Sequence, residues 1–480
     1  MVRNFAQATI GLLVLGVVLA TAKSWGTDPL PPPPVVSAKS AAKSAALPTQ
    51  LAYLGVGSCA STACHGGPAS LPLKWQSSYT VWATLDPHAK AYAVLTNPRS
   101  KEIVQRLDGN DHPEPWKVER CLACHAVQDG KGAQAKAWLA DGVSCEACHG
   151  PARNWLREHT TAGWTKLAKN EKYQARFGMR NTEDMLPRAR QCVSCHVGEL
   201  NPNGDVPRNV NHDLIAAGHP RLTFELSAYL ANMPSHWDRI AGEKTNAEAR
   251  AWAVGQVAGA EATFALREAH AAKSDGIEFA DYDCYACHHD LKAEKWRKDQ
   301  FEARRGHATP GDLRLSTWYT GMLPRLEAMA KVKLMPPTDS RFAGAVKGLE
   351  AWIQTQDAAA LRSTMAHIAR MGTDAAHWED ATQYYLALLA LDNAHRDYLK
   401  SRAHPPAKLD AEIRQSLASI YRGLRFLKIC QDQDGNVTID PDCKPPLTEV
   451  SKMDSPRDYD PDRFRAELKK LTALLTNDSQ

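Results

Sequence analysis

Two cysteines three positions apart, followed at once by a histidine, occur in the stretch Cys145-Glu146-Ala147-Cys148-His149. This is the spacing by which a c-type haem is attached to a polypeptide. Each cysteine sulfur would add to a vinyl group of the porphyrin, and the histidine would bind the iron from one face. Zinc sites and disulfides also use paired cysteines, but they do not require a histidine after each pair.

The Cys-x-x-Cys-His motif occurs four times, and a fifth, looser copy has four residues between its cysteines. With 12 Cys and 18 His in 480 residues, random placement predicts only about 0.01 strict copies. The sequence therefore predicts five covalent haem c groups, each with its iron. In chain order, the predicted attachment cysteines of the first to fifth motifs are Cys59 and Cys64, Cys121 and Cys124, Cys145 and Cys148, Cys192 and Cys195, and Cys284 and Cys287. The predicted proximal iron ligands are His65, His125, His149, His196 and His288.

The charge balance excludes one class of partner. The chain carries 58 basic and 54 acidic residues, for a net charge of +4. Nucleic-acid binding usually requires a concentrated basic patch, so we expect no nucleic-acid partner.

The N-terminus indicates export. Residues 1–22 contain Arg3, an apolar run and a small-residue ending at Ala22, which is typical of a signal peptide. The competing interpretation is an uncleaved membrane anchor, because the apolar run extends backwards to nearly the length of a span. Residues 23–50 are rich in Pro and Ala and should form a linker. Both interpretations predict a periplasmic protein, either free or tethered to the membrane by its N-terminal segment.

Two cysteines lie outside the five haem motifs. Cys430 and Cys443 enclose a short loop, and in an exported chain such a pair predicts a disulfide. The alternative is two free buried thiols.

The pattern of apolar residues divides the rest of the chain. Residues 51–307, the haem region, carry all five motifs and show no strong strand-like alternation. We expect short helices and long loops there, tied down by the cofactors. Residues 308–480, the C-terminal region, show apolar residues at helical spacing, for example Val346, Leu349 and Ile353. The predicted fold class is mainly α: a multihaem cytochrome domain followed by an α-helical bundle.

The second axial ligands decide whether any iron can bind a substrate. His88 follows Asp86 and Pro87, a capping residue and a first-turn proline. His159 lies four positions after Trp155 and thus on the same helical face. His219 lies between a glycine and a proline. His212 and His236 are further candidates, chosen over His112, His270 and His289.

Four segments resemble the multihaem cytochrome c-554 family, electron carriers related to hydroxylamine oxidoreductase. They are CEACHGPARNWLREH, DPHAKAY, AAGHPRLTFEL and DCYACHHDL, and the resemblance covers about residues 52–300. It implies a mainly helical fold with closely packed haems and assigns His88, His159 and His219 as distal ligands. The chain departs from the simplest carriers of that family, which bear four haems, and its first motif is lengthened.

Electron transfer is the first functional hypothesis, because haems with two histidine ligands leave no open position on iron. The protein would set the potentials by axial ligation, burial and hydrogen bonding, with other periplasmic or membrane redox proteins as partners. No catalytic residue is predicted for such a carrier.

The alternative is a multihaem oxidoreductase that acts on a small nitrogen or sulfur compound at one open haem, with Arg221 as an anion-binding residue. The sequence has no Cys-x-x-Cys-Lys motif, so the lysine-ligated haem of pentahaem nitrite reductases is not expected. A third hypothesis makes the C-terminal region a docking module within a larger complex.

Overall fold

The computed structural model describes most of the chain beyond the linker. The described residues are 51–110, 113–127, 139–200, 208–237, 246–272, 277–284, 287–288, 313, 315–334, 340–375, 378–401, 408–424, 429–431, 437–439 and 460–476. The predicted export segment, the linker and Cys443 lie outside these residues. Cys430 lies in strand β1 (Ile429–Gln431), which pairs antiparallel with β2 (Val437–Ile439). The disulfide and the export segment therefore stay predictions.

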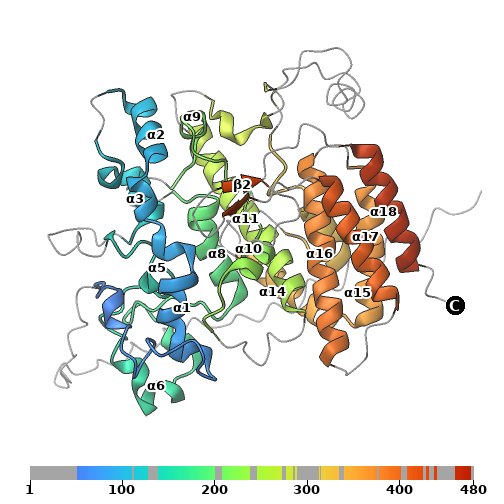
Figure 1. Ribbon diagram of the computed structural model, residues 1–480. Helices are drawn as coiled ribbons and strands as arrows, with labels where there is room; N and C mark the ends of the chain where they lie inside the picture. The colour runs from blue at the N-terminus through green and yellow to red at the C-terminus, as the bar shows by residue number, and fades with distance from the viewer. Residues whose placement is uncertain are drawn as a thin grey trace, which may run out of the picture. The chain divides into compact units, whose positions relative to one another are not determined.

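Short helices joined by irregular segments make up the first part of the haem region, shown from blue to green in Figure 1. The α-helices are α1 (Ser78–Leu85), α2 (Pro98–Asp108), α3 (Glu119–His125), α5 (Cys145–His149), α6 (Ala162–Lys166), α7 (Lys169–Lys172), α8 (Met185–His196), α9 (His212–Ala216) and α10 (Leu226–Asn232). The 3-10 helices are η1 (Val56–Ser58), η2 (Lys74–Ser77), η3 (Pro87–Lys90), η4 (Ala93–Thr96), η5 (Pro115–Lys117), η6 (Glu158–Thr160) and η8 (Phe279–Asp281). Isolated helices this short are unstable in water, so contacts with the surrounding protein must stabilise them.

One helix of the haem region is longer than expected. α11 (Ala247–Ala272) has 26 residues and is buried on nearly all sides from Ala249 to Ala260. Its alanines and glycines let neighbours approach closely: Gly255 lies against Leu226, and Gly259 lies against the ring of Tyr319. Because the helix is buried on nearly all sides, its sequence lacks a clear apolar stripe.

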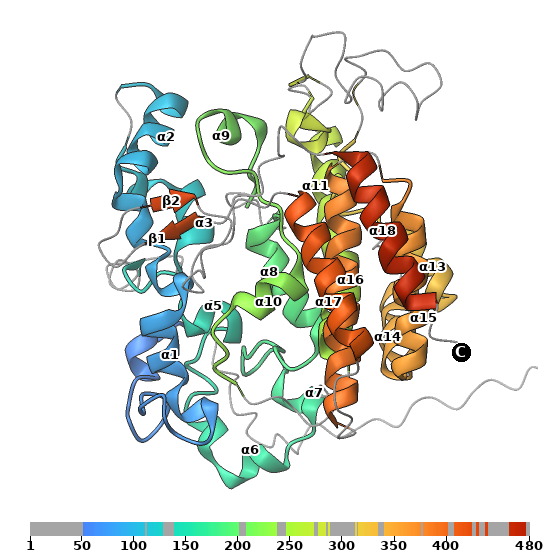
Figure 2. The same cartoon turned by 45° about the vertical axis from the view of Figure 1, so that its right-hand side comes forward.

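The C-terminal region is a set of packed helices, as predicted. They are α13 (Leu323–Ala330), α14 (Ser340–Gln354), α15 (Ala358–Gly372), α16 (Trp378–Ser401), α17 (Lys408–Leu424) and α18 (Pro461–Thr476). α15 packs against α16 and α18, while α17 packs against α16 and α18 (Figures 1 and 2). The predicted mainly α class is confirmed.

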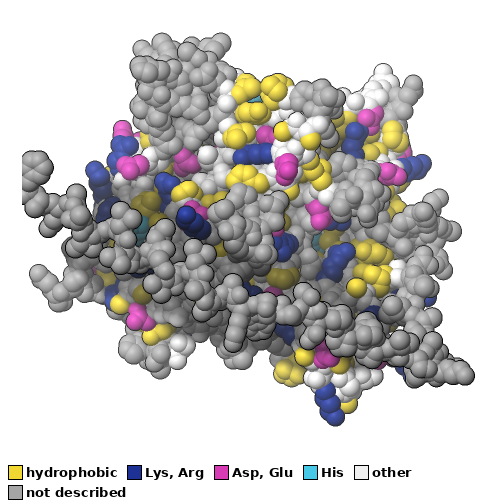
Figure 3. All heavy atoms as spheres, turned by 180° about the vertical axis from the view of Figure 1, so that it is seen from behind, with side chains coloured by type: hydrophobic (Ala, Val, Ile, Leu, Met, Phe, Trp, Pro, Cys, Tyr) yellow, Lys and Arg dark blue, Asp and Glu magenta, His cyan; other side chains and the backbone are white. Residues whose placement is uncertain are grey.

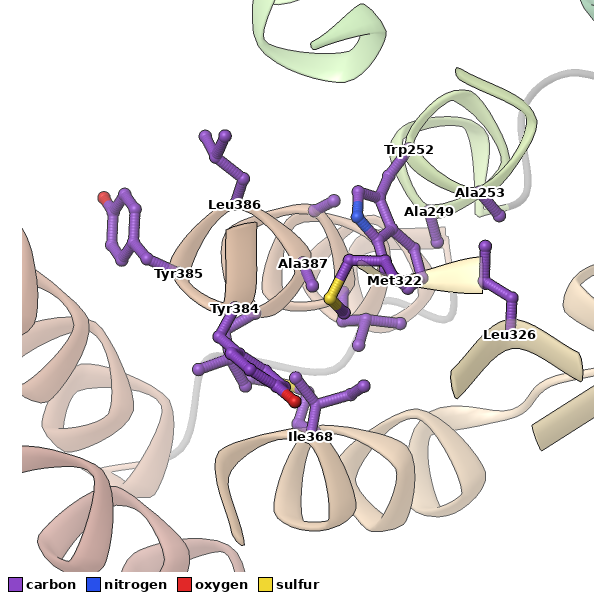
Figure 4. Packing of buried hydrophobic residues seen from close by; sticks show 14 of the residues in the cluster. Ala249, Trp252, Ala253, Met322, Leu326, Ile368, Tyr384, Tyr385, Leu386 and Ala387 are labelled. Carbon is purple, nitrogen blue, oxygen red and sulfur yellow. The ribbon is translucent and has the colours of Figure 1, made fainter. Parts of the chain in front are cut away.

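A single hydrophobic core joins both predicted regions. α11 packs against α8 and α10 of the haem region and against α14 and α16 of the C-terminal region. Trp252 of α11, Leu326 of α13 and Ile368 of α15 are fully buried in this cluster (Figure 4). The predicted division at residue 308 stays a prediction, and the cluster shows that the core crosses it.

The described surface mixes charge types. On the face seen in Figure 3, basic and acidic side chains alternate with apolar ones. None of the helices in the described ranges has the length and apolar character needed to cross a bilayer.

Candidate haem sites

Helical backbone positions the cysteines and histidines of the strict motifs. The second motif ends α3, the third motif forms α5, and the fourth motif ends α8. In the fifth motif the backbone N–H groups of Cys287 and His288 both donate to the carbonyl of Cys284, which makes a similar turn. Residues three and four apart share a helical face, so both sulfurs and the histidine of each motif can address one porphyrin.

Three pairs of histidine rings lie at similar distances from each other, with nearly parallel planes for His65 and His159 and nearly perpendicular planes for His88 and His196. The ring centroids are 6.3 Å apart for His65 and His159, 6.0 Å for His88 and His196, and 6.3 Å for His212 and His288. Metal–imidazole distances of about 2.0–2.1 Å would place two rings on opposite faces of one ion with centres about 6 Å apart. Each pair joins one predicted proximal ligand to one predicted distal ligand. Each pair is thus spaced so that it could hold one haem iron between its two rings.

The two remaining proximal histidines also have predicted distal histidines as neighbours. Burial lowers the pKa of His149 to about 4, and His236 is the nearby histidine that contributes most to this shift. Burial likewise lowers the pKa of His219, and the neighbouring His125 adds to the effect. Rings with low pKa values are neutral at pH 7, the form that binds a metal ion.

The hydrogen bonds of the rings leave the correct nitrogen available. A carbonyl or carboxylate can only accept, so a ring nitrogen that faces one must donate. Through Nδ1, His65 donates to the Trp75 carbonyl at 2.7 Å, His88 to Asp86 Oδ1 at 2.8 Å, His125 to the Ala91 carbonyl at 2.8 Å, His159 to the Trp155 carbonyl at 3.2 Å and His219 to the Pro220 carbonyl at 2.9 Å. Metal-ligating histidines typically hold their second nitrogen in this way, which leaves Nε2 for the metal. The residues fit haem iron on this observation.

His270, one of the alternatives in the sequence, has no free ring nitrogen. Its Nδ1 donates to Asp281 Oδ2 at 2.8 Å, and its Nε2 accepts from Asn209 Nδ2 at 2.9 Å. This buried histidine is already satisfied within the protein. His112 and His289 lie outside the described residues.

Sulfur atoms from different motifs lie close together. The sulfur of Cys59 lies within hydrogen-bonding range of the sulfur of Cys145. The sulfur of Cys124 lies within the same range of the sulfur of Cys195. Cys148 lies within electrostatic range of Cys195. The first motif is therefore adjacent to the third, the third to the fourth, and the fourth to the second.

A small, partly open cavity of about 70 Å³ lies near the fifth motif. Its lining includes Ile215, Arg221, Arg267 and Asp281. The buried Nε of Arg267 has no hydrogen-bond partner, and the nearby Arg221 guanidinium adds to the effect of burial in lowering the pKa of Arg267.

Two carboxylates that the sequence did not reveal support the haem motifs. Glu146, inside the third motif, is buried and accepts from the backbone N–H groups of Leu54, Gly55 and Ala152. It fixes the segment before the first motif against α5. Asp86 was predicted only as a helix cap, but it also orients the ring of His88. In the sequence, the sign of this role was the position of Glu146, a charged residue between the two cysteines of the third motif.

Comparison with known proteins addresses the first three motifs. Residues 58–150 match the family model of cytochrome c554 and c-prime. The resemblance is confirmed over this stretch. The likeness to this cytochrome family supports haem c with its iron as the cofactor of the matched stretch. A similar curated protein is cytochrome c-554 of Nitrosomonas europaea, which is 26% identical over 114 residues, or 23% of this chain and 48% of the relative.

The chain spans about half the length of this curated relative. The fourth and fifth motifs and the C-terminal region lie beyond the matched family model. No solved structure matches the chain.

Proposed function

We propose that this chain is an exported pentahaem c-type cytochrome that transfers electrons between redox partners. The observation that carries the proposal is the set of three histidine pairs at 6.0–6.3 Å, each made of one proximal and one distal candidate. Bound haem supplies reversible one-electron chemistry at iron. The paired histidines would fill both axial positions and so exclude substrate from the metal.

The remaining two sites follow the same scheme in this proposal. His219 would serve the iron of His125, and His236 would serve the iron of His149. Their support is electrostatic proximity rather than a ring-to-ring distance. They are therefore the sites at which an open iron would most readily overturn the proposal.

The order of the motifs in space supports a carrier. The proximity of their sulfurs supports the order first, third, fourth and second for the proposed binding sites. Arg221, two residues after His219, contacts Cys284 and thus brings the fifth motif to the neighbourhood of the second. A continuous row lets an electron enter at one end and leave at the other without the movement of any ligand.

The setting of this carrier is part of the proposal. Haem attachment of this type and the N-terminal residues 1–22 support a periplasmic location, with or without a membrane tether. Its partners would be other periplasmic or membrane redox proteins, and the mixed surface charge offers no support for nucleic acid.

The decisive experiment combines haem counting by mass with electron paramagnetic resonance of the oxidised protein. We expect five haems, all low-spin, that do not react with nitrite, hydroxylamine or, after reduction, carbon monoxide. A substantial high-spin signal that changes with one of these ligands would favour the oxidoreductase alternative.

A matched pair of variants identifies the ligand. In His159→Ala we expect one haem to become high-spin and to bind carbon monoxide after reduction. His367→Ala, which changes an exposed histidine on α15, should leave all five low-spin. An unchanged spectrum for His159→Ala would exclude this histidine as a ligand.

A further inference from the structure

The guanidinium of Arg221 links the fifth motif to the C-terminal region. Its Nη1 donates to Cys284 Sγ at 2.9 Å and to Glu379 Oε1 at 3.0 Å, and its Nη2 donates to Ser316 Oγ at 2.7 Å. Glu379 lies in the first turn of α16. The side chains of Arg221 and Glu379 are only 23% and 11% exposed.

We propose that Arg221 and Glu379 form a positioning pair that sets the reduction potential of the haem attached at Cys284 and Cys287. This inference rests on the proposed function, because it requires a haem at the fifth motif. It also assigns a role to the C-terminal region: α16 supplies the carboxylate that balances the cation beside the haem sulfur.

The physical basis is the charge that reduction adds. A ferrous haem carries one more electron than a ferric haem, so a nearby cation favours reduction and a nearby anion opposes it. Burial keeps salt from screening these charges. As an intact pair, Arg221 and Glu379 largely cancel, whereas removal of one partner leaves the other unbalanced.

Other charges near the pair do not change in the experiment. Asp283 acts on both Arg221 and Cys284, while Arg267 and Tyr319 lie in the electrostatic environment of Arg221. They set the baseline potential. Only the difference between variants reports on the pair itself.

The experiment is a spectroelectrochemical titration of the full-length protein and its variants, with haem content measured by mass on each sample. In Glu379→Gln we expect one of the five haems to shift to a higher potential. In Arg221→Gln the same haem should shift to a lower potential. Each shift should be about tenfold in the reduction equilibrium, or about 59 mV for one electron.

Two further variants separate charge from geometry. Arg221→Lys keeps the positive charge, so the potential of this haem should stay close to the wild-type value. The double variant Arg221→Gln with Glu379→Gln removes both charges, and its potential should also lie near the wild-type value. As a control, Glu467→Gln breaks the ion pair of Glu467 with Lys470 on α18 and should leave every potential unchanged.

Failure of the inference and failure of the proposed function give different results. Five haems with no shift in any variant would overturn the inference alone. A wild-type mass with four haems and free thiols at Cys284 and Cys287 would overturn the pentahaem proposal and the inference with it. Shifts of the same sign in both single variants would show that the pair does not act through charge.

Discussion

The haem region and the C-terminal region differ in the size of their clusters of buried apolar side chains. The C-terminal helices and α11 share one large cluster, with Leu349, Met365 and Leu388 fully buried. Two further clusters within the haem region are small, one around Leu122 and one around Trp155. The difference indicates that side chains alone stabilise the C-terminal helices, whereas the short helices require the apolar faces of porphyrins.

Removal of haem should have the largest effect and tests this difference directly. In protein produced without haem attachment, we expect the described residues between 51 and 172 to lose protection from amide hydrogen exchange, because their small clusters cannot stabilise short helices. Residues 340–424 should retain protection. Equal protection of both regions, or equal loss, would contradict the comparison.

A core truncation in the C-terminal region should have the next largest effect. Met365→Ala removes a fully buried side chain of α15 and should lower the free energy of unfolding by about 2–5 kcal/mol, measured by chemical denaturation. Leu315→Ala, at a side chain that is 46% exposed, is the matched control and should have little effect. Similar losses in the two variants would show that the region is not packed as described.

Removal of the Glu146 carboxylate tests polar support in the haem region. Glu146→Ala leaves the N–H groups of Leu54, Gly55 and Ala152 without their acceptor and should cost about 2–3 kcal/mol. Local hydrogen exchange of residues 52–56 reports the loss. Glu158→Ala, at an exposed glutamate, serves as control. Protection that survives in Glu146→Ala would assign the stability of this segment to other contacts.

A pH-dependent change in stability is expected at Glu225, which caps α10. Burial raises the pKa of Glu225 from 4.5 to about 7. Between these values the folded state binds more protons than the unfolded state, so stability should fall as pH rises from about 4.5 to 7, by about 1 kcal/mol per pH unit at most. Above that window the cost is constant.

Comparison with Glu225→Gln isolates this effect. The difference in unfolding free energy between wild type and variant, measured from pH 5 to pH 8, should change across the window and level off above it. A difference that does not vary with pH would show that Glu225 is already ionised at pH 5.

Sequence reasoning predicted the C-terminal helices well because their periodicity is a local signal. Val346, Leu349 and Ile353 are buried on α14, and Phe464 and Leu468 are buried on α18 behind the Asp460 cap. α16 was not anticipated, since its residues are buried on almost every side and leave no polar face to define a stripe. α11 was missed for the same reason.

In the candidate sites, the motifs suggest the proximal histidines from local spacing, and this assignment stays a prediction, whereas the contacts between histidine rings required the fold. His65 and His159 are separated by many residues, and only tertiary structure brings their rings together. The Arg221–Glu379 contact joins residues 158 positions apart and has no sequence signal. Local patterns can identify a ligand, but they cannot identify the ligand opposite to it.

The interleaving of the motifs also constrains how the protein is made. The first motif contacts the third, and the second contacts the fourth. A ribosome delivers the chain N-terminus first, so each early motif waits for a partner that has not yet been synthesised. If the chain is exported N-terminus first as proposed, the first two motifs would likewise be accessible for haem attachment before the third and fourth motifs arrive to cover them.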